Sequence, residues 1–103
     1  MFIEVKGVTL EKNNIAMFPD APTVRGLKHL TELKKCMADG YEACVVFVIQ
    51  MDGISYFVPN RKIDPEFCSA LADVKNAGVN VLAFDCVVTE DSMVINNQIQ
   101  TKI

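Results

Sequence analysis

The sequence predicts an α/β domain in which a mixed central sheet is flanked by two helices. Two stretches with apolar residues at helical spacing, residues 23–38 and 64–78, alternate with stretches typical of strands. One of these, Ala43–Ile49, is a continuous apolar run rich in β-branched residues, as expected of a strand covered on both faces. The expected order of elements is β-β-α-β-β-α-β-β, which indicates packed layers of helix and sheet.

The N-terminal end predicts a β-hairpin. Apolar and polar residues alternate along Phe2–Leu10, residues Glu11–Asn14 form a turn, and Ile15–Phe18 returns as a second strand. Three further strands are expected later in the chain, at residues 54–58, 79–88 and 93–95.

Both helices carry start and stop signals. Thr23 is the expected N-cap of the first helix, with help from Asp20, and Gly40 is its stop signal. Its expected buried stripe comprises Val24, Leu27, Leu30, Leu33 and Met37. Asp64 and Pro65 start the second helix, which ends at Gly78. Its apolar stripe comprises Phe67, Leu71 and Val74.

A chain of 103 residues with net charge −3 fits one domain, residues 1–103. It has no membrane-length apolar run and no secretion signal, so we expect a cytoplasmic protein without a membrane partner. The four cysteines lack zinc-site spacing and are expected to be buried free thiols. Six of the ten basic residues lie within residues 1–35, which predicts a modest positive patch or an ordinary solvated surface.

Glu4 and Lys6 are the residues best suited to chemistry. Alternate residues of a strand point to the same face, so this carboxylate and ammonium are expected to emerge side by side. Magnesium commonly binds one or two carboxylates plus waters and substrate phosphate. A neighbouring lysine can orient water or neutralise charge on the phosphate during phosphodiester hydrolysis. The alternative is a surface ion pair.

Several segments match a known family. They are Glu4-Val5-Lys6-x-Val8-Thr9-Leu10, Phe18-Pro19-Asp20-Ala21, Thr23-x-Arg25-Gly26-x-x-His29-Leu30-x-Glu32-Leu33, Ala43-x-Val45-x-Phe47-x-x-Gln50, Ile63-Asp64-Pro65 and Ala77-Gly78-Val79. On these segments, nearly the whole chain resembles the C-terminal domain of the sugar fermentation stimulation protein A family. The element order around Glu4 and Lys6 is similar to the restriction-endonuclease-like, PD-(D/E)XK nuclease core.

The resemblance implies a DNA-binding, nuclease-like domain that uses Mg²⁺ or Mn²⁺ and binds DNA without sequence specificity. It assigns Glu4 and Lys6 as catalytic residues, with Glu4 also the metal ligand. It places Arg25, His29 and Glu32 on a helix beside that site, as nucleic-acid-binding residues. The spacing of these residues agrees with that role. Arg25 and His29 share a helix face and can reach phosphate oxygens, and Glu32 can pair with either of them. A solvated stripe is the alternative.

One departure from the family pattern limits the expected activity. The family carries an acidic residue on the preceding strand and, before that, an oligonucleotide-binding-type domain, whereas this sequence begins with the Glu-Val-Lys strand. We therefore expect a fragment or truncated homologue with an incomplete magnesium site and little or no nuclease activity. Asp20 follows Glu4 and Lys6 instead of preceding them, so it is not assigned to the motif.

The exposed sheet edge at Phe2–Leu10 predicts a homodimer. Two other functions stay open. One is a non-catalytic DNA-binding regulator of sugar (maltose) metabolism on the same scaffold. The other is a structural α/β domain in which the acidic part of the chain, residues 36–103, binds protein.

Overall fold

The computed structural model describes all 103 residues and confirms a mixed α/β fold. Its elements in chain order are β1 (Phe2–Val8), β2 (Leu10–Lys12), β3 (Ile15–Phe18), α1 (Val24–Ala38), β4 (Ala43–Ile49), β5 (Tyr56–Pro59), α2 (Pro65–Asn76), β6 (Asn80–Val88) and β7 (Met93–Ile99). Each helix lies between stretches of strand, as the apolar periodicity predicts.

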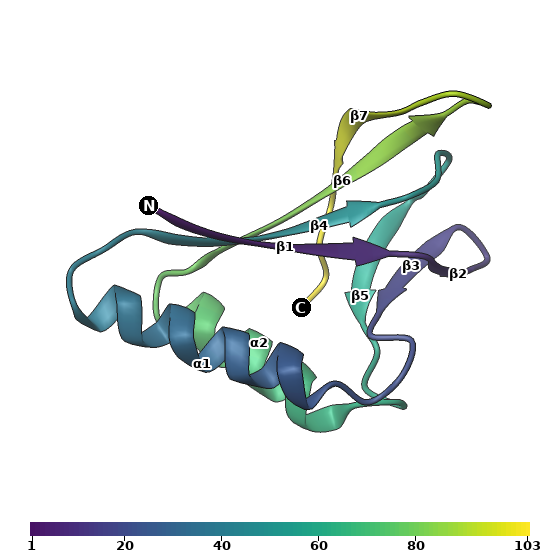
Figure 1. The fold of residues 1–103 in the computed structure, drawn as a ribbon. Helices are drawn as coiled ribbons and strands as arrows, with labels where there is room; N and C mark the ends of the chain where they lie inside the picture. Colours follow the sequence, from purple (N-terminus) through teal and green to yellow (C-terminus); the bar gives the residue numbers. More distant parts are fainter.

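The strands form two sheets. The larger sheet has the order β1-β4-β6-β7, in which the first three strands are parallel and β7 is antiparallel to β6. The smaller sheet has the order β2-β3-β5. Figure 1 shows both helices side by side on one face of the larger sheet, with the smaller sheet beyond the end of β1. The core therefore lies between the helices and the two sheets.

The predicted N-terminal hairpin is wrong in one respect. The alternating run divides at Thr9 into β1 and β2, and only β2 pairs with β3 as a hairpin. Asn13 and Asn14 form its turn with φ of 54° and 64°, the left-handed conformation that asparagine tolerates well. β1 instead pairs with β4, because α1 crosses over and returns the chain parallel to it. Glu4 and Lys6 thus lie on an edge strand and not on a hairpin arm.

Two strands differ in extent from the prediction. β5 begins at Tyr56, and β7 continues to Ile99 because its backbone stays paired with β6. The residues of β7 before Ile99 are exposed and several are polar, so no buried periodicity marked this part of the strand.

The buried face of α1 agrees with the prediction except at the start of the helix. Leu30 and Leu33 are buried and Leu27 and Met37 are half-buried, whereas Val24 is 86% exposed. Gly26, which the predicted stripe does not include, is also buried. A Cβ atom on Gly26 would stand 3.2 Å from Cε2 of Phe67 on α2, so the glycine permits close approach at this crossing. On α2, the predicted stripe of Phe67, Leu71 and Val74 is buried as expected.

Three of the four cysteines are buried, namely Cys44, Cys68 and Cys86, and Cys36 is half-buried. All four are free thiols, as predicted. Burial raises the pKa of the Cys44, Cys68 and Cys86 thiols, which keeps them protonated and unreactive near neutral pH. None of the helices is long and apolar enough to cross a membrane.

A single carboxylate links the starts of the two helices. Asp64 caps α2 by accepting from the Phe67 backbone N–H at 3.0 Å, and it also accepts from the Thr23 backbone N–H at 2.9 Å. Thr23 in turn caps α1 by accepting from the Gly26 N–H at 2.9 Å. Asp64, and not the predicted Asp20, therefore supports the start of α1.

Asp64→Ala is expected to lower the free energy of unfolding by about 1–2 kcal/mol, because two backbone N–H groups lose their acceptor. Urea denaturation followed by circular dichroism measures the change. Asp20→Ala is the matched control and should leave stability within about 0.5 kcal/mol of wild type. Equal losses in both variants would contradict the assignment of the cap to Asp64.

The same cap predicts a dependence of stability on pH. The hydrogen bond from Thr23, followed by that from Phe67, holds the pKa of the Asp64 carboxyl below its ordinary value of 3.8. The stabilisation is therefore complete above pH 3.8 and is lost as the pH falls through the lower folded-state pKa. The stability difference between wild type and Asp64→Asn should be constant above pH 3.8 and shrink as the pH falls below that value. A stability difference that does not change with pH in acid would contradict a lowered pKa of Asp64 in the folded protein.

Candidate active site

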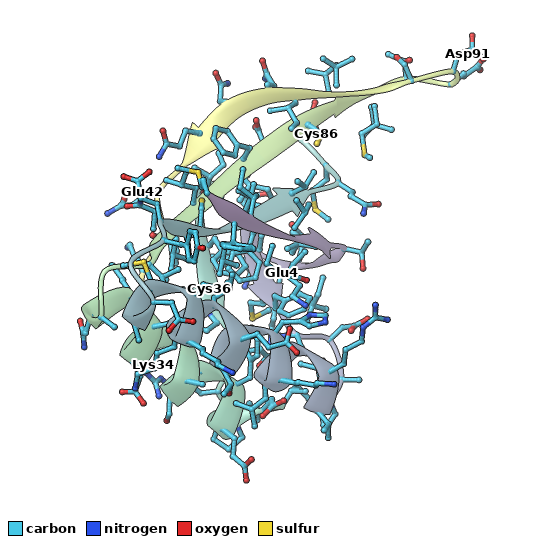
Figure 2. All side chains as sticks on the ribbon, turned by 60° about the vertical axis from the view of Figure 1, so that its left-hand side comes forward. Glu4, Lys34, Cys36, Glu42, Cys86 and Asp91 are labelled. Atoms are coloured by element: carbon cyan, nitrogen blue, oxygen red, sulfur yellow. The ribbon has the colours of Figure 1, made fainter.

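Glu4, Lys6 and His29 form a cluster between β1 and α1. Lys6 Nζ lies 3.2 Å from Glu4 Oε1, and His29 Nδ1 lies 2.9 Å from the same oxygen. Lys6 Nζ is also 2.6 Å from His29 Nδ1. Figure 2 shows Glu4 in the region between β1 and α1, far from Asp91 at the tip of the β6–β7 hairpin. Three ionisable groups thus meet within hydrogen-bond distance of one another.

The strand register explains why charged side chains occupy this place. Glu4 lies opposite Val45 and Lys6 opposite Phe47, and both partners are fully buried on the helix side of the sheet. The two charged residues therefore extend a row of core side chains to the edge of the sheet, where water reaches them. His29 comes from the face of α1 that covers this edge.

The cluster is partly shielded from solvent. The exposed fractions of the Lys6, His29 and Glu4 side chains are 11%, 20% and 29%. With a neutral imidazole, the Lys6 ammonium donates to both His29 Nδ1 and Glu4 Oε1. With a protonated imidazole, Nδ1–H donates to Glu4 instead. In either state the Glu4 carboxylate has a cationic or donor neighbour, and its second oxygen makes no ion pair.

Arg25 and Glu32 lie outside the cluster. Both are exposed and neither makes an ion pair, so the predicted pairing of Glu32 with Arg25 or His29 is absent. They share the stripe of α1 that carries His29, and Arg25 is about 6 Å along the helix axis from it. Arg25 is therefore a free cation one turn away from the cluster.

Sequence reasoning missed one feature of the site. It is the direct contact of His29 with Glu4 and Lys6, which depends on how α1 crosses β1. Gln50, which belongs to one of the matching segments, is exposed, and its Nε2 lies against the backbone of β1 at Gly7, on the face opposite that of Lys6.

The residues fit a divalent cation only in part. Glu4 supplies one carboxylate, and no group of three or more His, Cys, Asp or Glu side chains gathers to hold a metal ion. Mg²⁺ in proteins is often held by one or two carboxylates with water and substrate phosphate as the other ligands. The chain thus offers one anchoring ligand for such an ion and leaves the rest to water and substrate.

This arrangement belongs to a known class of domain. The family model described as "Sugar fermentation stimulation protein RE domain" matches residues 1–92, which is most of the chain. The chain therefore belongs to the sugar fermentation stimulation protein family, and the resemblance seen in its sequence motifs is confirmed.

Individual relatives agree with this assignment. A sugar fermentation stimulation protein homolog of Ruminiclostridium cellulolyticum is 53% identical over 103 residues, which is 100% of this chain and 46% of that protein. A homolog of Desulfitobacterium hafniense strain Y51 is 53% identical over 103 residues, covering 100% of this chain and 45% of that protein. The chain thus spans less than half the length of these relatives.

A solved structure has the same fold. The structure of Pyrococcus furiosus SfsA in complex with Ca²⁺ superimposes with a TM-score of 0.91 at 31% sequence identity. The match covers 98% of this chain and 44% of that one.

The Glu4–Lys6 pair is expected to be energetically coupled, because both side chains are shielded from water. A double-mutant cycle with Glu4→Gln and Lys6→Met should give a coupling of about 1 kcal/mol in the free energy of unfolding. The control cycle, Arg25→Met with Glu32→Gln, should be additive within about 0.3 kcal/mol. Urea denaturation measures both cycles, and equal coupling in the two would contradict the shielding.

Proposed function

We propose that this chain is a DNA-binding, nuclease-like domain in which Glu4 holds a divalent cation and Lys6 acts on the phosphate. The observation that carries the proposal is the cluster of Glu4, Lys6 and His29 at the accessible edge of the sheet. A carboxylate that can bind a divalent cation and an ammonium beside it are groups that assist phosphodiester hydrolysis. Membership of the sugar fermentation stimulation protein family supports the same function.

The cation is Mg²⁺ or Mn²⁺ in this proposal. Glu4 is the residue that would bind it, and the metal would activate a water molecule and neutralise charge on the phosphate. The Ca²⁺ complex of Pyrococcus furiosus SfsA supports a hard, oxygen-seeking cation in a fold of this kind. Lys6 stabilises negative charge that develops on the phosphate oxygens, and His29 holds Lys6 in place through Nδ1.

The DNA backbone would lie along α1. Arg25 is exposed, makes no ion pair and lies one helical turn from His29, so its guanidinium is free to bind phosphate oxygens in a bidentate manner. Contacts of this kind carry no base information, so binding would be non-specific. With net charge −3, the protein relies on this local site for attraction to DNA, and DNA as the ligand favours a cytoplasmic location.

The proposal includes weak catalysis. Glu4 is the single carboxylate of the cluster, and it is shared by Lys6 and His29. One carboxylate fixes a cation less firmly than two, so water and phosphate must complete its coordination. We therefore expect slow DNA hydrolysis at most.

The same observation favours a second candidate function. A domain that keeps Arg25 and Lys6 but holds metal poorly acts as a non-catalytic DNA-binding regulator of sugar (maltose) metabolism. The two candidates share the DNA-binding surface and differ only in whether metal at Glu4 leads to cleavage.

Titration of labelled double-stranded DNA tests both candidates. Binding should weaken steeply with rising salt, because phosphate contacts release counterions. Arg25→Ala should weaken binding about tenfold and lower the salt slope by about one. Lys35→Ala, an exposed cation in the last turn of the same helix, is the control and should bind as wild type does.

Incubation with Mg²⁺ or Mn²⁺ then separates enzyme from regulator. Slow cleavage that disappears in Glu4→Gln supports the nuclease, whereas metal-independent binding without cleavage selects the regulator. Cleavage that persists unchanged in Glu4→Gln would contradict the role of Glu4. Equal binding by Arg25→Ala and Lys35→Ala would contradict the role of Arg25.

A further inference from the structure

The outer face of the smaller sheet carries an aromatic ring in a row of side chains. Lys12 of β2 lies opposite Ile15 of β3, and Ile15 lies opposite Tyr56 of β5. Residues directly opposite one another share a face, so these three side chains form one row across the sheet. Phe57, the next residue after Tyr56, is fully buried and points to the core. The row therefore lies on the face turned away from the core.

The C-terminal end of the chain runs parallel to β5 and extends this row. Phe57 N–H donates to Gln100 O, and Lys102 N–H donates to Phe57 O, both at 2.9 Å. Because Thr101 is the partner of the inward-facing Phe57, its neighbour Lys102 faces outward. Lys102 Nζ lies 3.8 Å from the centre of the Tyr56 ring. A lysine thus stands at each end of the row, with the ring between them.

No carboxylate of these strands opposes the two lysines. Glu11 is the one acidic residue in β2, β3, β5 and residues 100–103, and it alternates to the other face of β2. Its Oε2 accepts from the Asn14 backbone N–H at 3.0 Å, in the turn between β2 and β3. Lys12 and Lys102 are exposed and make no ion pair. The outer face is therefore positively charged, although the net charge of the chain is −3.

The rest of this face is apolar and partly open to solvent. Leu10, Met17 and Val58 form a second row beside the first, and all three are half-buried. The side chain that lies over the Tyr56 ring is the exposed Lys102, so core packing does not seal that side of the ring. Proteins bind unpaired bases on such surfaces, where a base stacks on an aromatic ring and neighbouring cations bind the phosphates.

We propose that the outer face of the smaller sheet binds single-stranded nucleic acid, with one base stacked on Tyr56. Lys12 and Lys102 bind the phosphates on either side of that base. The Lys102 ammonium leaves the ring for a phosphate oxygen, so that a charge-assisted hydrogen bond replaces its contact with the ring. Positive charge selects a polyanion as the occupant, and stacking requires a base that is not paired in a duplex.

This surface is separate from the one proposed for duplex DNA. Figure 1 shows the smaller sheet beyond the end of β1, whereas the proposed duplex contacts lie on α1. Binding here requires neither a metal ion nor the cluster of Glu4, Lys6 and His29. The test of this inference is therefore independent of the proposed function.

Tyrosine fluorescence gives a local probe of the stacking. The chain has two tyrosines and no tryptophan, so Tyr41→Phe leaves Tyr56 as its one tyrosine. The emission of this variant should fall when oligodeoxythymidine or oligouridine is added at low salt, because a stacked base quenches the ring. A response to one of the two oligomers alone would identify DNA or RNA as the ligand. Tyr56→Phe is the matched control, in which the emission of Tyr41, between α1 and β4, should stay constant.

Lysine substitutions in the Tyr41→Phe background test the phosphate contacts. Lys12→Ala and Lys102→Ala should each weaken binding about fivefold and lower the salt slope by about 0.7. Lys75→Ala, an exposed cation in the last turn of α2, is the control and should bind as its parent does.

Three results would overturn the inference. They are an unchanged emission of Tyr56 at every oligomer concentration, equal quenching of Tyr41 and Tyr56, and equal affinities of the Lys12, Lys102 and Lys75 variants. Quenching of Tyr56 in a chain that does not bind duplex DNA would support this inference and reject the proposed function.

Discussion

Strand β1 lies parallel to β4, and the register between them places Glu4 and Lys6 opposite the buried residues Val45 and Phe47. Charged side chains therefore occupy the end of a core row, where α1 covers them and only part of each side chain meets water. A shift of one residue would turn both side chains to the open face of the sheet and away from His29. The chemistry of the site thus depends on a strand pairing that is itself maintained by the crossover helix.

Local patterns predicted the type and approximate extent of nearly every element. Apolar periodicity located both helices, and the continuous run Ala43–Ile49 identified the central strand. The sequence did not reveal the partner of β1, since alternation predicts a strand without naming its neighbour. The apolar stripe of α1 was predicted correctly except at Val24, and it omitted Gly26, which contributes no side chain yet lies at the contact with α2.

For the site, too, local spacing was predictable from the sequence and tertiary packing was not. The spacing of Glu4 and Lys6 was sufficient to place them on one face, and their 3.2 Å contact agrees. The family resemblance placed His29 on a helix beside the site as a nucleic-acid-binding residue, and the packing of α1 on β1 brings it into direct contact with Glu4. Glu32 was expected to pair with its helical neighbours and makes no ion pair, since long exposed side chains gain little from one. The catalytic and binding roles of these residues stay predictions.

Asp64 accepts from the N-cap residue of α1, Thr23, and from Phe67 in the first turn of α2, although Thr23 and Asp64 are 41 positions apart in the chain. This shared acceptor mechanically couples the loop before α2 to the first turn of α1, which carries Arg25. The position of the helix that carries His29 therefore depends in part on a residue that lies outside the cluster.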